Sequence, residues 1–158
     1  MIRWMDWSGH RWLAVPVRLY LGGLFLAACV HKIGHPASFA LDVATYQLLP
    51  LGTVNLFALI VPWVELLVGL MLVLGVRVRA AALVTSGLMV SFMIALGWAL
   101  VQGLDMSCGC FASQAAAEYD PISWRTMLRD ASWLALGLYV MCFDRQPLGV
   151  ESLFSKPR

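Results

Sequence analysis

Two cysteines separated by a single glycine, Cys108-Gly109-Cys110, have the clearest capacity for chemistry in this sequence. A disulfide between them would close a small, strained ring, and strain makes a disulfide easier to reduce and to exchange. The intervening glycine permits backbone angles that other residues resist. The spacing therefore predicts thiol–disulfide exchange at Cys108 and Cys110. A disulfide that only stiffens its loop is one alternative, and metal ligation is another.

The metal alternative draws on sulfur and imidazole side chains elsewhere in the chain. Met106 lies two residues before Cys108, and soft sulfur ligands favour Cu(I) or Zn. His31 and His35 are four residues apart, which places both on one face of a helix. The plainer interpretation is a pair of histidines exposed at a membrane interface. A third is that one of these histidines, or Lys32, lowers the pKa of a nearby thiol and activates it.

The other two cysteines stand alone. Cys29 lies two residues before His31 and could act as a resolving thiol for the Cys108–Cys110 pair. A lone cysteine among small apolar residues is more often a buried hydrophobic side chain. The run Leu26-Ala27-Ala28-Cys29 is also similar to a lipoprotein cleavage box, in which Cys29 would carry the lipid. Cys142 is expected to be a packing residue.

Charged residues inside apolar segments form another candidate site. Glu65 lies about eleven residues from either end of the apolar segment 54–76, where a carboxylate is costly unless it is paired or protonated. Arg18 lies inside the first apolar segment and could reach toward Glu65. One interpretation is a structural salt bridge. The other is a polar interior site of Arg18, Lys32 and Glu65 that serves protons or a quinone head group.

Four apolar segments must position these residues, at about 13–30, 54–76, 80–101 and 123–143. Hydrophobic residues make up 61% of the 158 residues and charged residues 13%, against about 45–50% and about 25% in a typical soluble domain. A span needs about 20 residues of helix, and helices satisfy their own backbone hydrogen bonds in lipid. We therefore expect an all-α, four-transmembrane-helix bundle forming one membrane domain over residues 1–158.

The first connecting loop is expected to contain a short helix lying in the membrane interface, at about 37–49. Phe39, Val43 and Tyr46 recur there at helical spacing, between Pro36 and Pro50. The fourth span is the weakest, because Arg125 and Arg129 stand near its start and would have to extend to the interface.

The distribution of basic residues predicts the orientation in the membrane. Four spans place both termini on the same side as the turn near residues 77–79, and that side carries seven basic residues against three on the other. The seven are Arg3, Arg11, Arg77, Arg79, Arg145, Lys156 and Arg158. The excess predicts cytoplasmic termini in a bacterial inner membrane, with loops 31–53 and 102–122 in the periplasm. A net charge of +2 without a basic stripe indicates no nucleic-acid partner.

Several short motifs follow one another along the chain. They are Arg18, His31-Lys32-Ile33-Gly34, Phe39, Tyr46-Gln47-Leu48-Leu49-Pro50, Pro62-Trp63-Val64-Glu65-Leu66-Leu67-Val68-Gly69-Leu70 and Cys108-Gly109-Cys110-Phe111. Together they resemble the MauE/DoxX family of redox-associated membrane proteins, most closely its MauE branch. Ala112 stands where that family often has glycine. The resemblance implies a four-helix membrane bundle that helps to form or reshuffle disulfides in exported proteins, often beside a periplasmic thioredoxin-like partner.

These observations lead to three functional hypotheses. The first is a membrane thiol–disulfide oxidoreductase in which Cys108 and Cys110 exchange with a periplasmic thioredoxin-like protein, with a quinone as a conceivable electron acceptor. The second is a protein that binds or delivers Cu or Zn through Cys108, Cys110, Met106 and the two histidines. The third is a structural subunit or assembly factor of a larger membrane complex, in which the cysteines are incidental.

Overall fold

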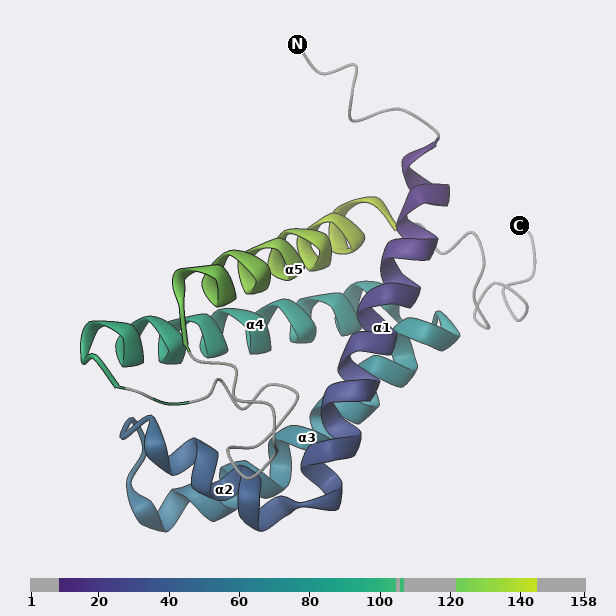
Figure 1. Ribbon diagram of the computed structural model, residues 1–158. Helices are drawn as coiled ribbons and strands as arrows, with labels where there is room; N and C mark the ends of the chain where they lie inside the picture. Colours follow the sequence, from purple (N-terminus) through teal and green to yellow (C-terminus); the bar gives the residue numbers. More distant parts are fainter. Residues whose placement is uncertain (1–8, 105, 107–121, 145–158) are drawn as a thin grey trace.

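The computed structural model describes residues 9–104, 106 and 122–144. This part of the chain folds into helices, with no strand among the described residues (Figure 1). The helices are α1 (His10–Gly34), α2 (Pro36–Thr45), α3 (Leu51–Leu74), α4 (Val78–Val101) and α5 (Trp124–Phe143). The all-α class is therefore confirmed, while the predicted Cys108–Cys110 site lies outside the described residues.

The four long helices match the predicted segments to within a few residues at most ends. The largest difference is α1, which runs four residues beyond the predicted end because it includes His31 and Lys32. The predicted segment ended before these polar side chains, although Lys32 has a buried partner on α3. Pro16 and Pro62 lie within α1 and α3, and neighbouring helices make such prolines tolerable in apolar helices.

Three of the described helices are long and apolar enough to cross a membrane. They are Trp12–Gly34 within α1, together with α3 and α4. The fourth long helix, α5, has 20 residues, but Arg125, Arg129 and Asp130 all fall in its first half. The chain is thus a multi-pass membrane protein, and length and composition support three of the four predicted spans.

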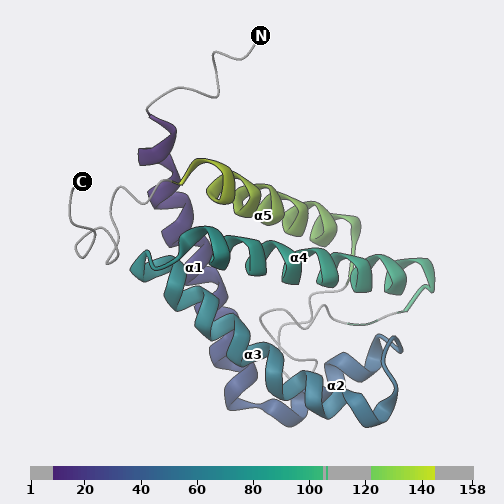
Figure 2. The ribbon, with the colours of Figure 1, turned by 180° about the vertical axis from the view of Figure 1, so that it is seen from behind.

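The long helices form two pairs that diverge from a common end (Figures 1 and 2). In the first pair, α1 crosses α3 closely, since a Cβ added to Gly22 would lie 2.7 Å from Val73 Cγ2 and 3.0 Å from the Gly69 carbonyl oxygen. In the second pair, a Cβ added to Gly137 of α5 would lie 2.9 Å from Ser86 Oγ of α4. Glycine at these crossings lets the helix backbones approach.

The common end, which we call the joined end, is closed by apolar packing and by polar contact between α1 and α5. Leu21, Leu72, Val78 and Val140 form a buried cluster that connects α1, α3, α4 and α5. The start of α1 and the end of α5 meet there through a hydrogen bond of 2.9 Å between His10 Nδ1 and the Tyr139 hydroxyl. The first and last helices therefore reach the same end as the α3–α4 turn, as expected for an even number of long helices.

The opposite end, which we call the open end, carries α2, the end of α4 and the start of α5. Phe39 and Val43 of α2 pack on Val54 and Ala58 of α3. The predicted helix at 37–49 is shorter than expected, because α2 ends at Thr45 and the chain then turns through Gln47, whose φ is 53°.

Candidate functional site

The polar centre of the molecule is an ion pair between α1 and α3. Lys32 Nζ donates a hydrogen bond of 2.6 Å to Glu65 Oε1, and each residue is only 7% exposed. Lys32 Nζ also lies 5.0 Å from the centre of the Phe39 ring. The expectation that Arg18 pairs with Glu65 is wrong, because Lys32 provides the cation. Breaking such a buried pair is costly, since the remaining charge keeps no partner.

Arg18 takes part in a separate ion pair at the joined end. Its Nη1 lies 3.2 Å from Asp144 Oδ2, and both side chains are almost fully buried. Arg18 and Lys32 are fourteen residues apart on α1, which separates them by about 21 Å along the helix axis. Of the three residues predicted to form one polar interior site, the structure therefore brings together Lys32 and Glu65 and places Arg18 elsewhere.

A cavity of about 270 Å³ lies between the two diverging helix pairs, next to the Lys32–Glu65 pair. All five described helices contribute to its wall, which is mainly apolar. Six aromatic side chains line it: Phe25, Phe39, Tyr46, Phe57, Phe92 and Trp133. Its polar lining consists of Lys32, Asp42, Tyr46, Glu65, Ser91, Asp130 and the Trp133 indole. A concave apolar wall with a few convergent polar groups is the usual form of a small-molecule site.

Two buried acids on this wall, Asp42 and Asp130, were not among the sequence-predicted site residues. They are 3% and 1% exposed. Burial of the phenol is the largest cause that raises the pKa of Tyr46 above its ordinary value, and the charges of Asp130 and Asp42 raise it further. The signal that could have found Asp42 is similar to the one that identified Glu65, an acid among apolar residues. Asp130 follows Arg129 directly near the polar start of the last predicted span, where a charged residue is expected.

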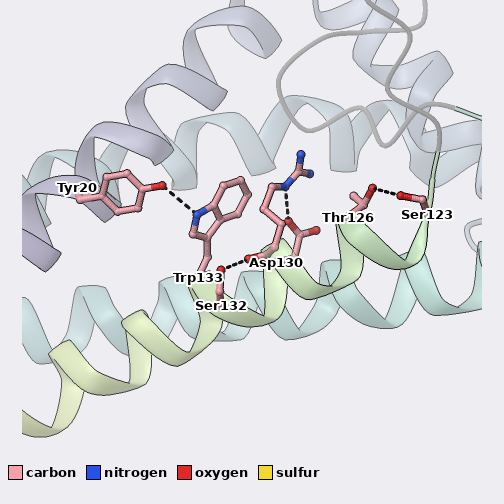
Figure 3. A network of polar contacts seen from close by, with 7 residues as sticks. Tyr20, Ser123, Thr126, Asp130, Ser132 and Trp133 are labelled. Carbon is pink, nitrogen blue, oxygen red and sulfur yellow. Dashed lines mark hydrogen bonds and ion pairs between the residues drawn. The ribbon is translucent and has the colours of Figure 1, made fainter.

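The first half of α5 presents further polar contacts toward the same region (Figure 3). Asp130 Oδ1 accepts a hydrogen bond of 3.2 Å from Arg129 Nε. The Arg129 guanidinium also lies 4.9 Å from the Trp133 ring centre, and the Trp133 indole donates a hydrogen bond of 3.2 Å to the Tyr20 hydroxyl on α1. Of these contacts, the Trp133–Tyr20 hydrogen bond connects α5 to α1 and so links the two helix pairs.

Met106 is described and lies at the open end of the molecule. It is 3% exposed and packs in one buried cluster with Tyr46 and Ala99. Its carbonyl oxygen accepts a hydrogen bond of 3.1 Å from the Ile122 N–H. Residues 106 and 122, which flank the segment containing Cys108 and Cys110, are therefore held together beside a residue of the cavity wall.

The remaining predicted residues lie on α1 and α5. The rings of His31 and His35 have their centres 5.2 Å apart, at the junction of α1 with α2. Cys29 is fully buried, and its thiol donates to the Leu26 carbonyl oxygen at 3.1 Å. Cys142 is exposed, so the expectation that it is a packing residue is wrong. The described residues contain no cluster of three or more His, Cys, Asp or Glu side chains suited to a metal ion.

The fold and this site define a small multi-pass helical membrane protein with a buried ion pair and a cavity among its helices. Residues 10–143 match the family model described as "Methylamine utilisation protein MauE", and the chain belongs to the MauE family. The match names the MauE branch of the resemblance, and the wider grouping with DoxX stays a prediction.

Two curated relatives carry the name methylamine utilization protein MauE. The protein from Paracoccus denitrificans is 31% identical over 125 residues, which cover 78% of this chain and 66% of the relative. The protein from Methylorubrum extorquens is 35% identical over 124 residues, which cover 78% of this chain and 64% of the relative. The matched part thus spans slightly less than two thirds of each relative. No solved structure matches the chain.

Proposed function

We propose that this protein is a four-span inner-membrane thiol–disulfide exchange protein that helps to form disulfides in exported proteins. Its active cysteines would be Cys108 and Cys110, and its partner a periplasmic thioredoxin-like protein. The relatives are named for methylamine utilization, and we propose that the client of this chain belongs to the same process. The observation that carries the proposal is the position of Met106 and Ile122 beside the cavity wall.

Covalent geometry limits how far the cysteine pair can lie from that position. Cys108 is two residues after Met106, and an extended chain covers at most about 3.3–3.6 Å per residue. The Cα atoms of Met106 and Cys108 can therefore be at most about 7 Å apart. Met106 packs with Tyr46, which lines the cavity together with Lys32 and Glu65. A reactive cysteine pair near this site could draw on its charged groups.

The four-span arrangement is supported by the dimensions of α5. A helix of 20 residues is about 30 Å long, the thickness of a hydrocarbon core. Arg129 is held by Asp130 and lies over Trp133, which removes part of the cost of its charge. From the excess of basic residues near the termini and the α3–α4 turn, we infer that the joined end faces the cytoplasm and that the open end, with α2 in the interface, faces the periplasm.

The proposed exchange conserves electrons and protons. A client or partner dithiol is oxidised as its thiolate attacks the Cys108–Cys110 disulfide, and resolution of the mixed disulfide leaves both cysteines reduced. Return of the pair to a disulfide releases two electrons and two protons. An acceptor of two electrons and two protons is required, and a membrane quinone is the chemical class that fits a membrane-embedded protein. Lys32 and Glu65 would stabilise charge close to that acceptor.

Trapping of a mixed disulfide tests the proposal. A Cys110→Ser variant should accumulate a covalent complex through Cys108, or a Cys108→Ser variant through Cys110, with a thioredoxin-fold protein recovered on non-reducing gels. Cys142→Ser is the matched control, since Cys142 is exposed on α5 and should leave the pattern unchanged. Absence of a trapped partner, together with full client oxidation by the Cys108→Ser/Cys110→Ser double variant, would contradict the proposal and favour an assembly role.

The alternative of Cu or Zn binding has one specific observation in its favour, the approach of His31 and His35. Elemental analysis of the reduced, purified protein would detect a stoichiometric metal. Its loss in both His35→Ala and Cys108→Ser variants would support binding shared by the two regions. Retention of redox trapping by His35→Ala would favour the thiol–disulfide function.

A further inference from the structure

The Lys32–Glu65 pair satisfies only one oxygen of the carboxylate. Glu65 Oε1 accepts from Lys32, whereas Glu65 Oε2 is buried and has no hydrogen-bond partner among the described residues. A buried acceptor without a partner costs free energy comparable to a lost hydrogen bond. Glu65 lines the cavity between the helix pairs, so a molecule in this cavity could supply the missing donor.

The wall of the cavity indicates the shape of such a molecule. Its six aromatic residues come from all five described helices, with Tyr46 directly after α2. Aromatic side chains pack favourably against flat rings in offset-stacked or edge-to-face arrangements. The cavity volume of about 270 Å³ is slightly below the range of about 300–1,000 Å³ that is typical of pockets for drug-sized ligands. The cavity therefore suits one substituted ring with a short apolar extension.

The exposed parts of the wall indicate how a ligand would enter. Phe57 and Leu48 line the cavity and are 42% and 41% exposed. Phe57 lies on α3, one of the helices long and apolar enough to span a membrane. An entrance bordered by apolar side chains on a membrane helix opens to lipid, which admits a lipid-soluble molecule.

We propose that this cavity binds a lipid-soluble molecule with a planar aromatic head that carries a hydroxyl group, the chemistry shared by phenols and hydroquinones. The hydroxyl donates to Glu65 Oε2, the ring packs among the aromatic side chains, and the apolar extension leaves past Phe57. Lys32 keeps the carboxylate in place and can donate to a second oxygen on the ring. The proposal concerns binding alone and does not depend on the thiol chemistry of Cys108 and Cys110.

The test compares ligands on the unaltered full chain, purified in detergent and studied by isothermal titration calorimetry. A short-chain alkyl hydroquinone and an alkyl phenol should bind, and the dimethyl ether of the hydroquinone, which lacks both donors, should bind at least about tenfold more weakly. Equal binding of hydroquinone and phenol assigns one hydroxyl contact, whereas tighter binding of the hydroquinone adds a second contact to Lys32. Binding of the ether or of a straight-chain alcohol as tight as that of the hydroquinone would overturn the proposal, as would no binding by either aromatic ligand.

Two variants on α1 provide a steric test. Ala28 lines the cavity, so Ala28→Leu should fill part of it and weaken hydroquinone binding by at least about tenfold. The neighbouring Ala27 is exposed, and Ala27→Leu should leave binding unchanged. Thermal unfolding checks that both variants fold. Mixed-disulfide trapping tests the thiol proposal separately, so that its failure and failure of the binding proposal are distinguished.

Discussion

One buried ion pair lies at the joined end of this molecule and another lies beside the cavity, and the two pairs sit in different surroundings. Arg18–Asp144 joins α1 to α5 at the joined end, next to the cluster of Leu21, Leu72, Val78 and Val140. Lys32–Glu65 joins α1 to α3 within one helix pair and borders a cavity. The first pair links the beginning of the fold to its end. The second leaves one buried carboxylate oxygen without a hydrogen-bond partner among the described residues, which is the basis of the proposed ligand site.

Breaking the ion pair at the joined end should have the largest effect. Arg18→Met removes the cation that pairs with the buried Asp144 carboxylate, and loss of one member of a buried pair costs about 3–5 kcal/mol. The free energy of unfolding in detergent should fall by that amount. An Arg18→Met/Asp144→Leu double variant, which removes both charges, should recover at least half of the loss. A loss below about 1 kcal/mol in the single variant would show that the pair does not hold α5 to α1.

The corresponding change at the cavity should cost less. Lys32→Met leaves Glu65 without its cation, but a carboxyl beside a cavity can take up a proton or a water molecule, which limits the cost to about 1–3 kcal/mol. Unfolding under the conditions used for Arg18→Met measures it. The same variant should weaken hydroquinone binding, whereas Arg18→Met should not. Equal losses of unfolding free energy in Lys32→Met and Arg18→Met would show that the two ion pairs do not differ in this way.

The close crossing of α1 and α3, which holds Lys32 near Glu65, can be tested at adjacent glycines. Gly22→Ala places a methyl group 2.7 Å from Val73 Cγ2. Overpacking of this kind costs about 1–3 kcal/mol, offset by about 1 kcal/mol from the better helix propensity of alanine. Unfolding should therefore show a net loss of up to about 2 kcal/mol. Gly23→Ala is the matched control, because its Cβ meets nothing within 4 Å, and it should be neutral or stabilising.

The smallest effect is expected from Tyr46 at alkaline pH. Burial, with Asp130 and Asp42 nearby, raises the pKa of its phenol above the ordinary value. The folded protein therefore holds this proton more tightly than the unfolded chain, so the stabilisation is present below about pH 10 and is lost as the pH rises further. Between about pH 9 and about pH 11 the wild type should lose more unfolding free energy than Tyr46→Phe. Equal losses would mean that the phenol is not desolvated at the open end.

Local patterns in the sequence determined the helices. Apolar runs of membrane-spanning length, punctuated by Pro36, Pro50 and Gly75, specify five helices and their approximate ends, since helix formation depends on residues close in the chain. The order of short motifs was also sufficient to indicate the MauE family, which the family model confirms. Glu65 was identified as a site residue from its depth in an apolar segment alone.

The tertiary structure decided which charged residues meet. Arg18 and Lys32 lie on the same helix, and nothing in the sequence distinguishes them as partners for Glu65. The crossing of α1 with α3 at Gly22 and Gly69 brings Lys32 next to Glu65. The packing of α5 against α1 at the joined end brings Arg18 next to Asp144, which is 126 residues away along the chain. The cavity, and the burial of Asp42 and Asp130 on its wall, likewise depend on how the two helix pairs diverge. Partners of this kind are set by the rotation and crossing of packed helices, which local sequence does not encode.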